Sequence, residues 1–185
     1  MRLETDRLIL RHWEERDFEP LAAILGDAEV RRFYPKALSR EEARAQFDFA
    51  LARQAEVGFH FGAAERKADG RMLGLVGLGI IGEPLRSALA GRPDVEIGWQ
   101  FDRSVWGQGY APEAAAAWLT HGFATLNLPE IVAFTFVGNQ PSQRVMGKLG
   151  MERQAEDDFE HPALAAGHPL RPHVLYRKRK TVEAA

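Results

Sequence analysis

The chain has 185 residues, of which 45% are hydrophobic and 27% are charged, and its formal net charge is −2. These values are typical of a compact globular domain and do not favour an intrinsically disordered chain. The near-neutral charge gives no broad electrostatic reason to expect a nucleic acid or an anionic membrane as partner. Because the chain has no cysteine, disulfides, thiolate metal sites and an acyl-cysteine intermediate are excluded as well.

The start of the chain is charged where a signal peptide needs an apolar core. The longest mostly apolar run, 72–81, is about half of the ~20 residues that a membrane-spanning helix needs. We therefore expect a cytoplasmic protein without a membrane partner. We also expect a single domain over residues 1–185, with a core of about 5–178.

Hydrophobic periodicity and capping residues predict the elements of the first half of the chain. A serine and a glutamate three residues further on form a capping box at the start of the second helix. Ala68-Asp69-Gly70 is typical of a hairpin turn between the second and third strands. The predicted elements are a strand at Leu8–Leu10, helices at 17–26 and 39–56, and strands at 59–65 and 71–81.

The second half predicts a loop, two strands that flank a strong helix, and a tail. Proline and glutamate favour the start of the helix because proline pre-sets φ and glutamate complements the helix dipole. Ser142 is positioned to cap a short helix that ends before Gly150. The predicted elements are a loop at 82–93, a strand at 95–101, a helix at 114–126, a strand at 131–137, a helix at 142–149, a loop-like tail at 157–172 and a last strand at 173–178.

A glycine-rich turn stands between the predicted strand 95–101 and the helix that follows it. Gly107 and Gly109 allow the backbone to approach a ligand closely, and a helix N-terminus presents unpaired N–H groups and a partial positive charge. Such a turn is suited to a phosphate group. No Walker loop is present, and Pro112 stands where a Rossmann fingerprint needs glycine or alanine, so an ordinary NTP or NAD site is not favoured.

Three segments carry a more specific pattern. The turn reads Trp-Gly-Gln-Gly-Tyr-Ala from Trp106 to Ala111, and Pro-Glu-Ala follows. The opening reads Thr-Asp-Arg-Leu-Ile-Leu-Arg at 5–11, with Asp-Phe at 17–18. The third segment, at 139–151, reads Asn-Gln-Pro-Ser-Gln-Arg-Val-Met-Gly-Lys-Leu-Gly-Met.

In this order the segments resemble the GNAT superfamily of N-acetyltransferases, and within it the ribosomal-protein N-terminal acetyltransferases of the RimJ and RimL type. The superfamily's pyrophosphate motif is Gln/Arg-x-x-Gly-x-Gly/Ala. Gly109 and Ala111 match it, whereas Trp106 replaces Gln or Arg at its first position. The third segment resembles the group's Asn-x-x-Ser…Lys-Leu-Gly-Phe signature. The similarity extends from about residue 5 to about residue 155.

The resemblance implies an α+β fold with a central mixed sheet of about six to seven strands and about four flanking helices. The sheet would splay open for CoA between the strands at 95–101 and 131–137. The pyrophosphate would bind the amides of residues 107–111. The pantetheine would pair with backbone at 101–103, where an N–H could polarise the thioester carbonyl.

Acetyl-CoA is thus the expected co-substrate, with no metal, and the acceptor is an amine on a protein N-terminus or a small molecule. The protein is expected to be a monomer or a homodimer. The residues expected to bind the cofactor are Phe101, Asp102, Arg103, Trp106, Gly107, Gln108, Gly109, Tyr110, Ala111, Asn139 and Ser142.

Transfer to an amine needs a base, because an aliphatic amine is mostly protonated at neutral pH. Glu96 is the first candidate: it lies on the strand beside the expected CoA opening, on the face opposite its apolar neighbours. A solvated or ion-paired strand residue is the alternative interpretation of Glu96. The other candidate bases are Asp94, Glu160, His161 and His173.

Ser142 is the candidate acid for the leaving thiolate, although its role as a helix cap would by itself explain a serine. Tyr110 is the alternative acid, and Asn139 is expected to bind the pantetheine or the acceptor. The spacing of His161, His168 and His173 matches no helical metal-ligand pair. This segment is therefore interpreted as a loop over the acceptor site. A non-catalytic acyl-CoA-binding module of the same fold remains the alternative to an enzyme.

Overall fold

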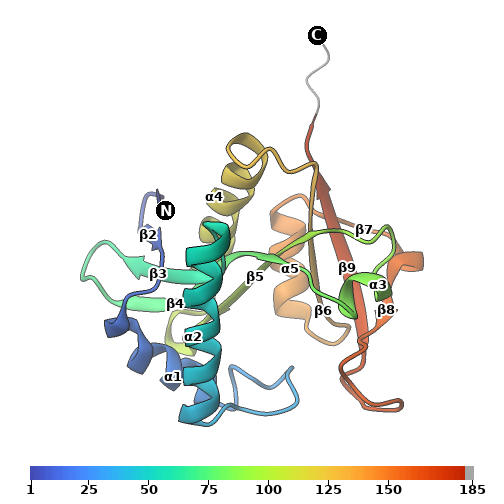
Figure 1. Cartoon of the computed structure of the whole chain (residues 1–185), viewed down its shortest axis with the longest axis horizontal. Helices are drawn as coiled ribbons and strands as arrows, with labels where there is room; N and C mark the ends of the chain where they lie inside the picture. Colours follow the sequence, from blue (N-terminus) through green and yellow to red (C-terminus); the bar gives the residue numbers. More distant parts are fainter. Residues whose placement is uncertain (182–185) are drawn as a thin grey trace. The chain divides into compact units, whose positions relative to one another are not determined.

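A computed structural model of the chain describes residues 1–181, which form two compact units (Figure 1). Unit 1 comprises residues 1–79 and 98–118, and unit 2 comprises residues 80–97 and the chain from 119 onward. Strand β5 (Val95–Phe101) and helix α4 (Tyr110–Ala124) therefore each begin in one unit and end in the other. Over the described residues the fold has nine strands, in a mixed sheet, and five α-helices.

Unit 1 is built on four antiparallel strands in chain order, followed by the second half of β5. Eight of the nine residues of the longest, β4, are buried, which accounts for its continuous apolar run. Gly74 allows β4 to approach β5, since a Cβ at Gly74 would lie 2.3 Å from the carbonyl oxygen of Gln100. The four strands are β1 (Arg2–Glu4), β2 (Leu8–Arg11), β3 (Gly62–Arg66) and β4 (Met72–Ile80).

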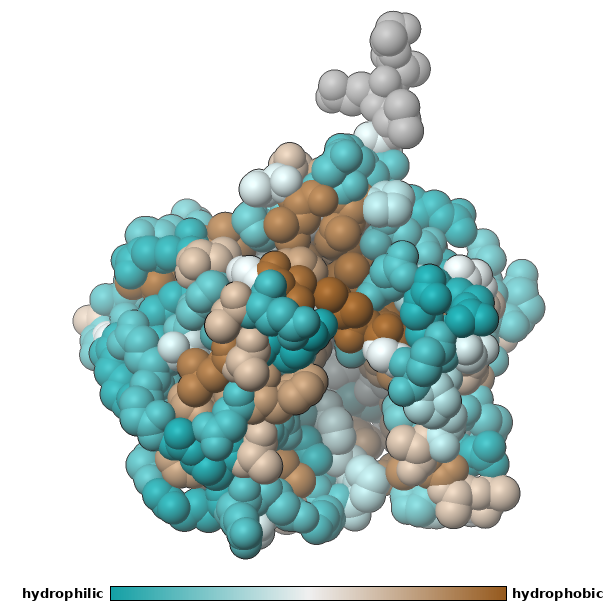
Figure 2. Space-filling view, viewed as in Figure 1, coloured by the Kyte–Doolittle hydropathy of each residue, from teal (hydrophilic) through white to brown (hydrophobic). Residues whose placement is uncertain are grey.

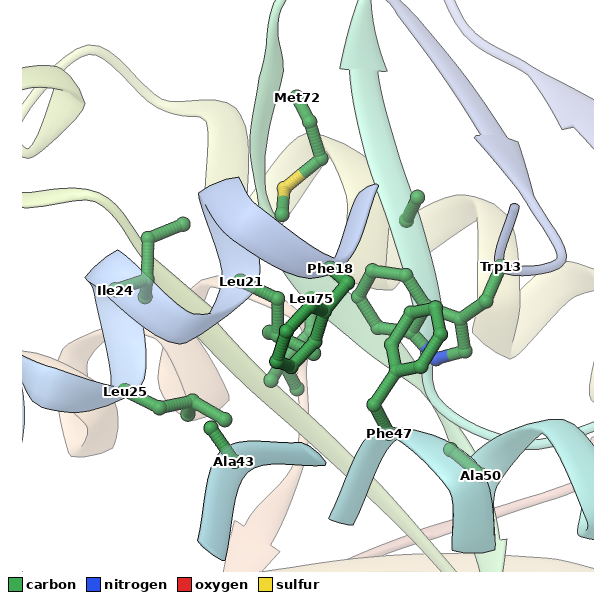
Figure 3. Packing of buried hydrophobic residues seen from close by; sticks show 11 residues of the cluster. Trp13, Phe18, Leu21, Ile24, Leu25, Ala43, Phe47, Ala50, Met72 and Leu75 are labelled. Carbon is green, nitrogen blue, oxygen red and sulfur yellow. The ribbon is translucent and has the colours of Figure 1, made fainter. Parts of the chain in front are cut away.

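Two helices, α1 (Phe18–Gly26) and α2 (Arg40–Val57), enclose the main apolar core of unit 1. The predicted capping box is confirmed: Ser39 Oγ accepts from the Glu42 N–H, and the Glu42 side chain accepts from the Ser39 N–H. Figure 3 shows three aromatic rings at the centre of this core. Their centroids lie 5.5 Å apart for Trp13 and Phe47 and 5.7 Å apart for Phe18 and Phe47.

A buried ion pair ties this core to the strands. Arg11 on β2 donates to both carboxylate oxygens of Asp17, at 2.7 and 2.9 Å, and to Glu65 on β3 at 2.6 Å. Arg11 and Asp17 are only 7% and 2% exposed. The hydrogen bonds to Asp17 raise the pKa of Arg11 more than burial lowers it, so the guanidinium stays charged.

Unit 2 is built around β9, which pairs with β6 over the full length of β6, from Glu130–Arg179 to Phe136–His173. The first half of β5 runs parallel to β6, with Glu96 opposite Val132. Two very short strands pair with the other edge of β9. The elements of unit 2 are α3 (Leu85–Ala88), β6 (Glu130–Phe136), α5 (Gln140–Lys148), β7 (Glu152–Arg153), η3 (Ala155–Asp157), β8 (Phe159–Glu160) and β9 (Pro172–Arg179).

The expected counts of six to seven strands and four helices were too low. The missed strands β1, β7 and β8 have two or three residues each, too few to show a period of two. The missed helix α3 has four residues and lies inside the predicted loop 82–93. In the predicted loop-like tail 157–172, β8 forms because β9 is available as a partner.

Figure 2 shows one face of the molecule, on which hydrophilic residues predominate and apolar residues gather near the upper middle of the view. Among residues 1–181, no helix is both long enough and apolar enough to span a bilayer.

Replacing Asp17 with alanine should lower the free energy of unfolding by roughly 3–5 kcal/mol, because Arg11 is left as a buried, partly uncompensated charge. Chemical denaturation of both proteins measures the change. The matched control is Asp48→Ala, which removes an exposed pair with Arg44 at 2.9 Å and should cost about 1 kcal/mol or less. Equal losses in the two variants would contradict the structural role of the Arg11–Asp17 pair.

Candidate active site

The glycine loop, residues 107–111, joins η2 (Arg103–Val105) to the start of α4. Gly107 and Gly109 have φ values of +75° and +82°, a region that side chains other than glycine rarely adopt. Within residues 1–181, the N–H groups of the glycine loop donate to no protein acceptor. Unpartnered donors at a helix N-terminus are suited to an anionic group.

Trp106, at the position where the family motif has Gln or Arg, closes the turn that leads into the loop. Its indole Nε1–H donates to the Phe101 carbonyl at 2.8 Å. The ring is 39% exposed and carries the guanidinium of Arg32 at 4.8 Å from its centroid. A cation is thus held beside the glycine loop although the motif's own polar residue is absent.

The backbone at 101–103 is already partly used by the protein. The Phe101 carbonyl accepts from Trp106, and the Asp102 N–H donates to the Leu73 carbonyl at 2.8 Å. The Asp102 carboxylate caps η2 through the Ser104 N–H and binds Arg71 at 2.7 Å. The N–H of Arg103, the first residue of η2, has no partner within the helix and is the donor that this segment can offer a ligand.

Arg7 and Glu113 hold the glycine loop against the β1–β2 turn in unit 1. The Glu113 carboxylate in the first turn of α4 accepts from Thr5 Oγ1, from the Arg7 N–H at 3.0 Å and from Arg7 Nε at 2.6 Å. Arg7 also donates to the Gln108 carbonyl at 2.9 Å. Although burial acts to raise the pKa of Glu113, these hydrogen bonds outweigh it and hold that pKa below its usual value.

The sequence alone predicts neither Arg7 nor Glu113 in this cluster. From the sequence, Glu113 is expected only to complement the helix dipole. The available signal was that both belong to family-like segments, Thr5–Arg11 and the residues after the glycine loop.

Tyr110 is buried inside unit 1 with 8% of its surface exposed. Its ring lies under the Arg7 guanidinium, whose central carbon is 4.2 Å from the ring centroid. Because the side chain is buried and its ring is covered by Arg7, the geometry does not favour Tyr110 as the acid, and its contribution to the loop is its backbone N–H.

Glu96 lies on β5 opposite Val132 and is partly buried. It has no hydrogen-bond or ion-pair partner within residues 1–181, and burial alone raises the pKa of Glu96 to about 7. Two rival bases are engaged elsewhere: Asp94 pairs with Arg86 at 2.7 Å, and Glu160 pairs with Arg171 at 3.4 Å. Of these three acidic candidates, Glu96 is the one that combines a raised pKa with no partner in the described part of the chain.

Asn139, and not Ser142, caps α5. Asn139 Oδ1 accepts from the Ser142 N–H at 3.3 Å, and α5 begins at Gln140, with Pro141 in its first turn. The predicted cap role of Ser142 was therefore wrong, because Asn139 occupies the N-cap. The Asn139 amide also donates to Thr135 Oγ1 at 2.8 Å and to Ser142 Oγ at 3.1 Å. Since the Ser142 hydroxyl accepts from Asn139, its own hydrogen can be donated elsewhere.

The three tail histidines do not act together. His161 and His173 are neighbours, with ring centroids 4.8 Å apart, whereas His168 Nδ1 accepts from the Leu170 N–H in a separate turn. In the described part of the chain, no group of three or more histidine and carboxylate side chains could hold a metal ion.

Residues 7–152 match the family described as "Acetyltransferase (GNAT) domain". The chain is 32% identical over 155 residues to the uncharacterized N-acetyltransferase YoaA of Bacillus subtilis, covering 82% of this chain and 83% of YoaA. The chain therefore belongs to the GNAT family of acetyltransferases.

Solved structures show the same fold. A GNAT-family acetyltransferase from Bacillus anthracis superposes with a TM-score of 0.78 at 24% identity, over 97% of this chain and 99% of that one. RimL, a ribosomal L7/L12 alpha-N-protein acetyltransferase in complex with coenzyme A, superposes with a TM-score of 0.72 at 17% identity, over 97% and 98% of the two chains.

Gly109→Ala should weaken acetyl-CoA binding by about tenfold, because alanine is strained at a φ of +82° and its Cβ would lie 3.4 Å from Arg7 Nη2. Gly70→Ala is the matched control: it carries similar strain, at a φ of +69°, in a hairpin turn with nothing within 4 Å. Calorimetric titration with acetyl-CoA should show weaker binding in Gly109→Ala only, whereas the melting temperature should fall in both variants. Unchanged affinity in Gly109→Ala would count against the glycine loop as the anion site.

Proposed function

We propose that the protein transfers the acetyl group of acetyl-CoA directly to an amine, through a complex that holds both substrates. The observation that carries this proposal is the glycine loop, whose unpartnered N–H groups begin a helix in a chain of an acetyltransferase family. The absence of cysteine from the sequence favours direct transfer over an acyl-thiol intermediate. The acceptor is a protein N-terminus, as in the RimJ and RimL group, or a small amine.

The cofactor proposal assigns the pyrophosphate of acetyl-CoA to the N–H groups of the glycine loop. Arg32, held over Trp106, adds positive charge that a pyrophosphate favours. The pantetheine arm would run along residues 101–103. There the Arg103 N–H would donate to the thioester oxygen, and such a donor contributes about 3 kcal/mol as charge develops on that oxygen.

The chemistry proposal assigns the base to Glu96 and the acid to Ser142. A carboxylate with a pKa of about 7 is partly ionised at neutral pH and is a better acceptor than an ordinary glutamate for the proton that the incoming ammonium must lose. The free amine attacks the thioester carbonyl, the C–S bond breaks, the nitrogen loses a proton as the amide forms, and the CoA thiolate gains one. Ser142 can relay this proton, giving its own hydrogen to the thiolate and taking that of the nitrogen, because Asn139 donates to its oxygen and leaves its hydrogen available.

Glu96→Gln should lower kcat by about 100-fold or more, because a positioned general base contributes about 10²–10⁴ in rate. In the unmodified protein, kcat/KM should fall as pH drops below about 7, where Glu96 is protonated. Binding of acetyl-CoA should survive the substitution. Asp94→Asn, two residues away and paired with Arg86, is the control and should retain activity.

The two measurements separate three cases. Loss of transfer with intact binding in Glu96→Gln supports the assignment. Full activity in that variant means that another residue is the base. If the unmodified protein binds acetyl-CoA but acetylates no amine, the protein is an acyl-CoA-binding module and not an enzyme.

The raised pKa of Glu96 also predicts how stability depends on pH. Between the ordinary glutamate value of 4.5 and about 7, the folded state holds a proton that the unfolded state has released. Stability should therefore fall as pH rises through this interval and level off above it. Denaturation curves of Glu96→Gln should lack this component, and an identical pH dependence in both proteins would contradict the burial of the carboxyl group.

A further inference from the structure

Four side chains in unit 2 form one group, here called the aromatic cluster: Phe134 on β6, Phe159 on β8, His173 on β9, and His161 in the segment after β8. The ring centroids lie 5.8 Å apart for Phe134 and Phe159, 5.6 Å for Phe159 and His173, and 4.8 Å for the two histidines. All four are half-buried, and Phe134 and Phe159 also pack against the apolar core formed by Ile81, Leu89, Val132 and Leu175.

The aromatic cluster lies on the same face of the sheet as Glu96. Paired residues on neighbouring strands point to one face, so Glu96 shares a face with Val132. Alternation along β6 places Phe134 and Phe136 on that face, and Phe136 is paired with His173. The Asn139–Ser142 pair contacts the opposite face of β6 through Thr135.

The two imidazoles of the cluster are neutral, and their hydrogen bonds fix their tautomers. His173 Nδ1 lies 3.0 Å from the Arg171 carbonyl and must donate to it, which leaves Nε2 as a lone-pair acceptor. His161 Nδ1 accepts from the Ala163 N–H at 3.3 Å, so its Nε2 carries the hydrogen. Burial lowers the pKa of both rings, that of His173 to about 4.

The chemistry of these groups suits one type of amine. The exposed parts of aromatic rings attract a single ammonium group and pack on an apolar or aromatic body, and His173 Nε2 can accept an N–H from the amine. A polycation would need several free carboxylates, but Glu160, next to the cluster in sequence, is paired with Arg171.

Strand β9 beside the aromatic cluster offers an extended peptide little unpaired backbone. β6 occupies one edge of β9. On the other edge β8 pairs with residues 172–173 and β7 with residues 176–177, so only Val174 and Leu175 remain between them. Two residues are too few for a peptide to add as a strand.

We propose that the aromatic cluster binds the acceptor, and that this acceptor is a primary monoamine attached to an apolar or aromatic body. This inference rests on the proposed acetyl transfer and names the substrate class of the same reaction. Phe134 and Phe159 hold the body of the substrate, His173 orients its nitrogen, and Glu96 on the same face removes the proton.

The test measures acetyl transfer by release of CoA thiol, which a thiol reagent reports without background because the chain has no cysteine. The acceptors are 2-phenylethylamine, spermidine and a short peptide with a free N-terminal serine. We expect kcat/KM for 2-phenylethylamine to exceed the other two by about tenfold or more, in line with the discrimination that apolar pockets give.

Two variants test the cluster itself. Phe159→Leu keeps an apolar side chain but removes the ring, and His173→Phe keeps a ring but removes the Nε2 acceptor. Either should raise KM for 2-phenylethylamine by about fivefold or more, as expected for loss of a ring or hydrogen-bond contact, and leave KM for acetyl-CoA unchanged. His168→Ala, in the same segment but outside the cluster, is the control, and melting temperatures check that each variant folds.

Preference for spermidine or the peptide would overturn the inference, and so would an unchanged KM for 2-phenylethylamine in the folded variants. In both cases acetyl-CoA still binds and is consumed, so the proposed transfer stands. Failure of the unmodified protein to bind acetyl-CoA would instead remove the proposed function, and this inference with it.

Discussion

The bond between Arg7 and Glu113 is the constraint on which the candidate cofactor site depends. It joins residues 106 positions apart and holds the first turn of α4 to the β1–β2 turn. A helix N-terminus binds anions only if its amides stay unpaired and in place. The Glu113 side chain holds that turn in place, and Arg7 donates to the Gln108 carbonyl. These bonds position the loop but leave its N–H groups without protein acceptors among the described residues.

Arg32 and Arg7 compensate for the polar residue that Trp106 replaces at the first position of the phosphate motif. Trp106 uses its N–H to close the turn on Phe101, and its exposed ring carries Arg32. Positive charge thus approaches the loop from two side chains elsewhere in unit 1, Arg7 and Arg32. The departure from the motif changes the source of the charge and leaves the backbone cradle intact.

Burying Glu96 without a partner lowers the stability of the folded protein. Most charged side chains near it in sequence have partners, as Asp94 has Arg86. Glu96 is held in unit 2 by burial without a partner, which destabilises its charged form and makes the carboxylate a stronger base. A cation placed beside it would stabilise the fold and weaken the base.

The sequence predicted those features that local signals determine. The capping box at Ser39, the buried strand β4 and the glycine turn before α4 were all confirmed, because propensity, capping and burial agree there. In the part of the chain that the structure describes, the short strands β7 and β8 pair only with β9, and no local sequence pattern predicts them. The cap of α5 is Asn139 and not Ser142, because both residue types favour an N-cap and only the backbone geometry decides between them.

The contacts that escaped prediction are those between distant positions. Glu113 binds Thr5 and Arg7, and Glu96 acquires its raised pKa from burial that its strand neighbours do not reveal. The pairing of His161 with His173, and their contact with Phe159, depends on the register of β8 against β9. The sequence could therefore propose candidate residues for the site, but it could not predict their protonation states or their partners.

The central claim is that the glycine loop binds the pyrophosphate of acetyl-CoA, and backbone amide NMR tests it most directly. On titration with acetyl-CoA, the amide resonances of residues 107–111 should shift together and saturate, while the amide of Gly70, another glycine with positive φ in the same unit, stays in place. NAD at the same concentration should leave the loop amides unmoved. Binding of acetyl-CoA that leaves the loop resonances unchanged, or an equal response to NAD, would contradict the account.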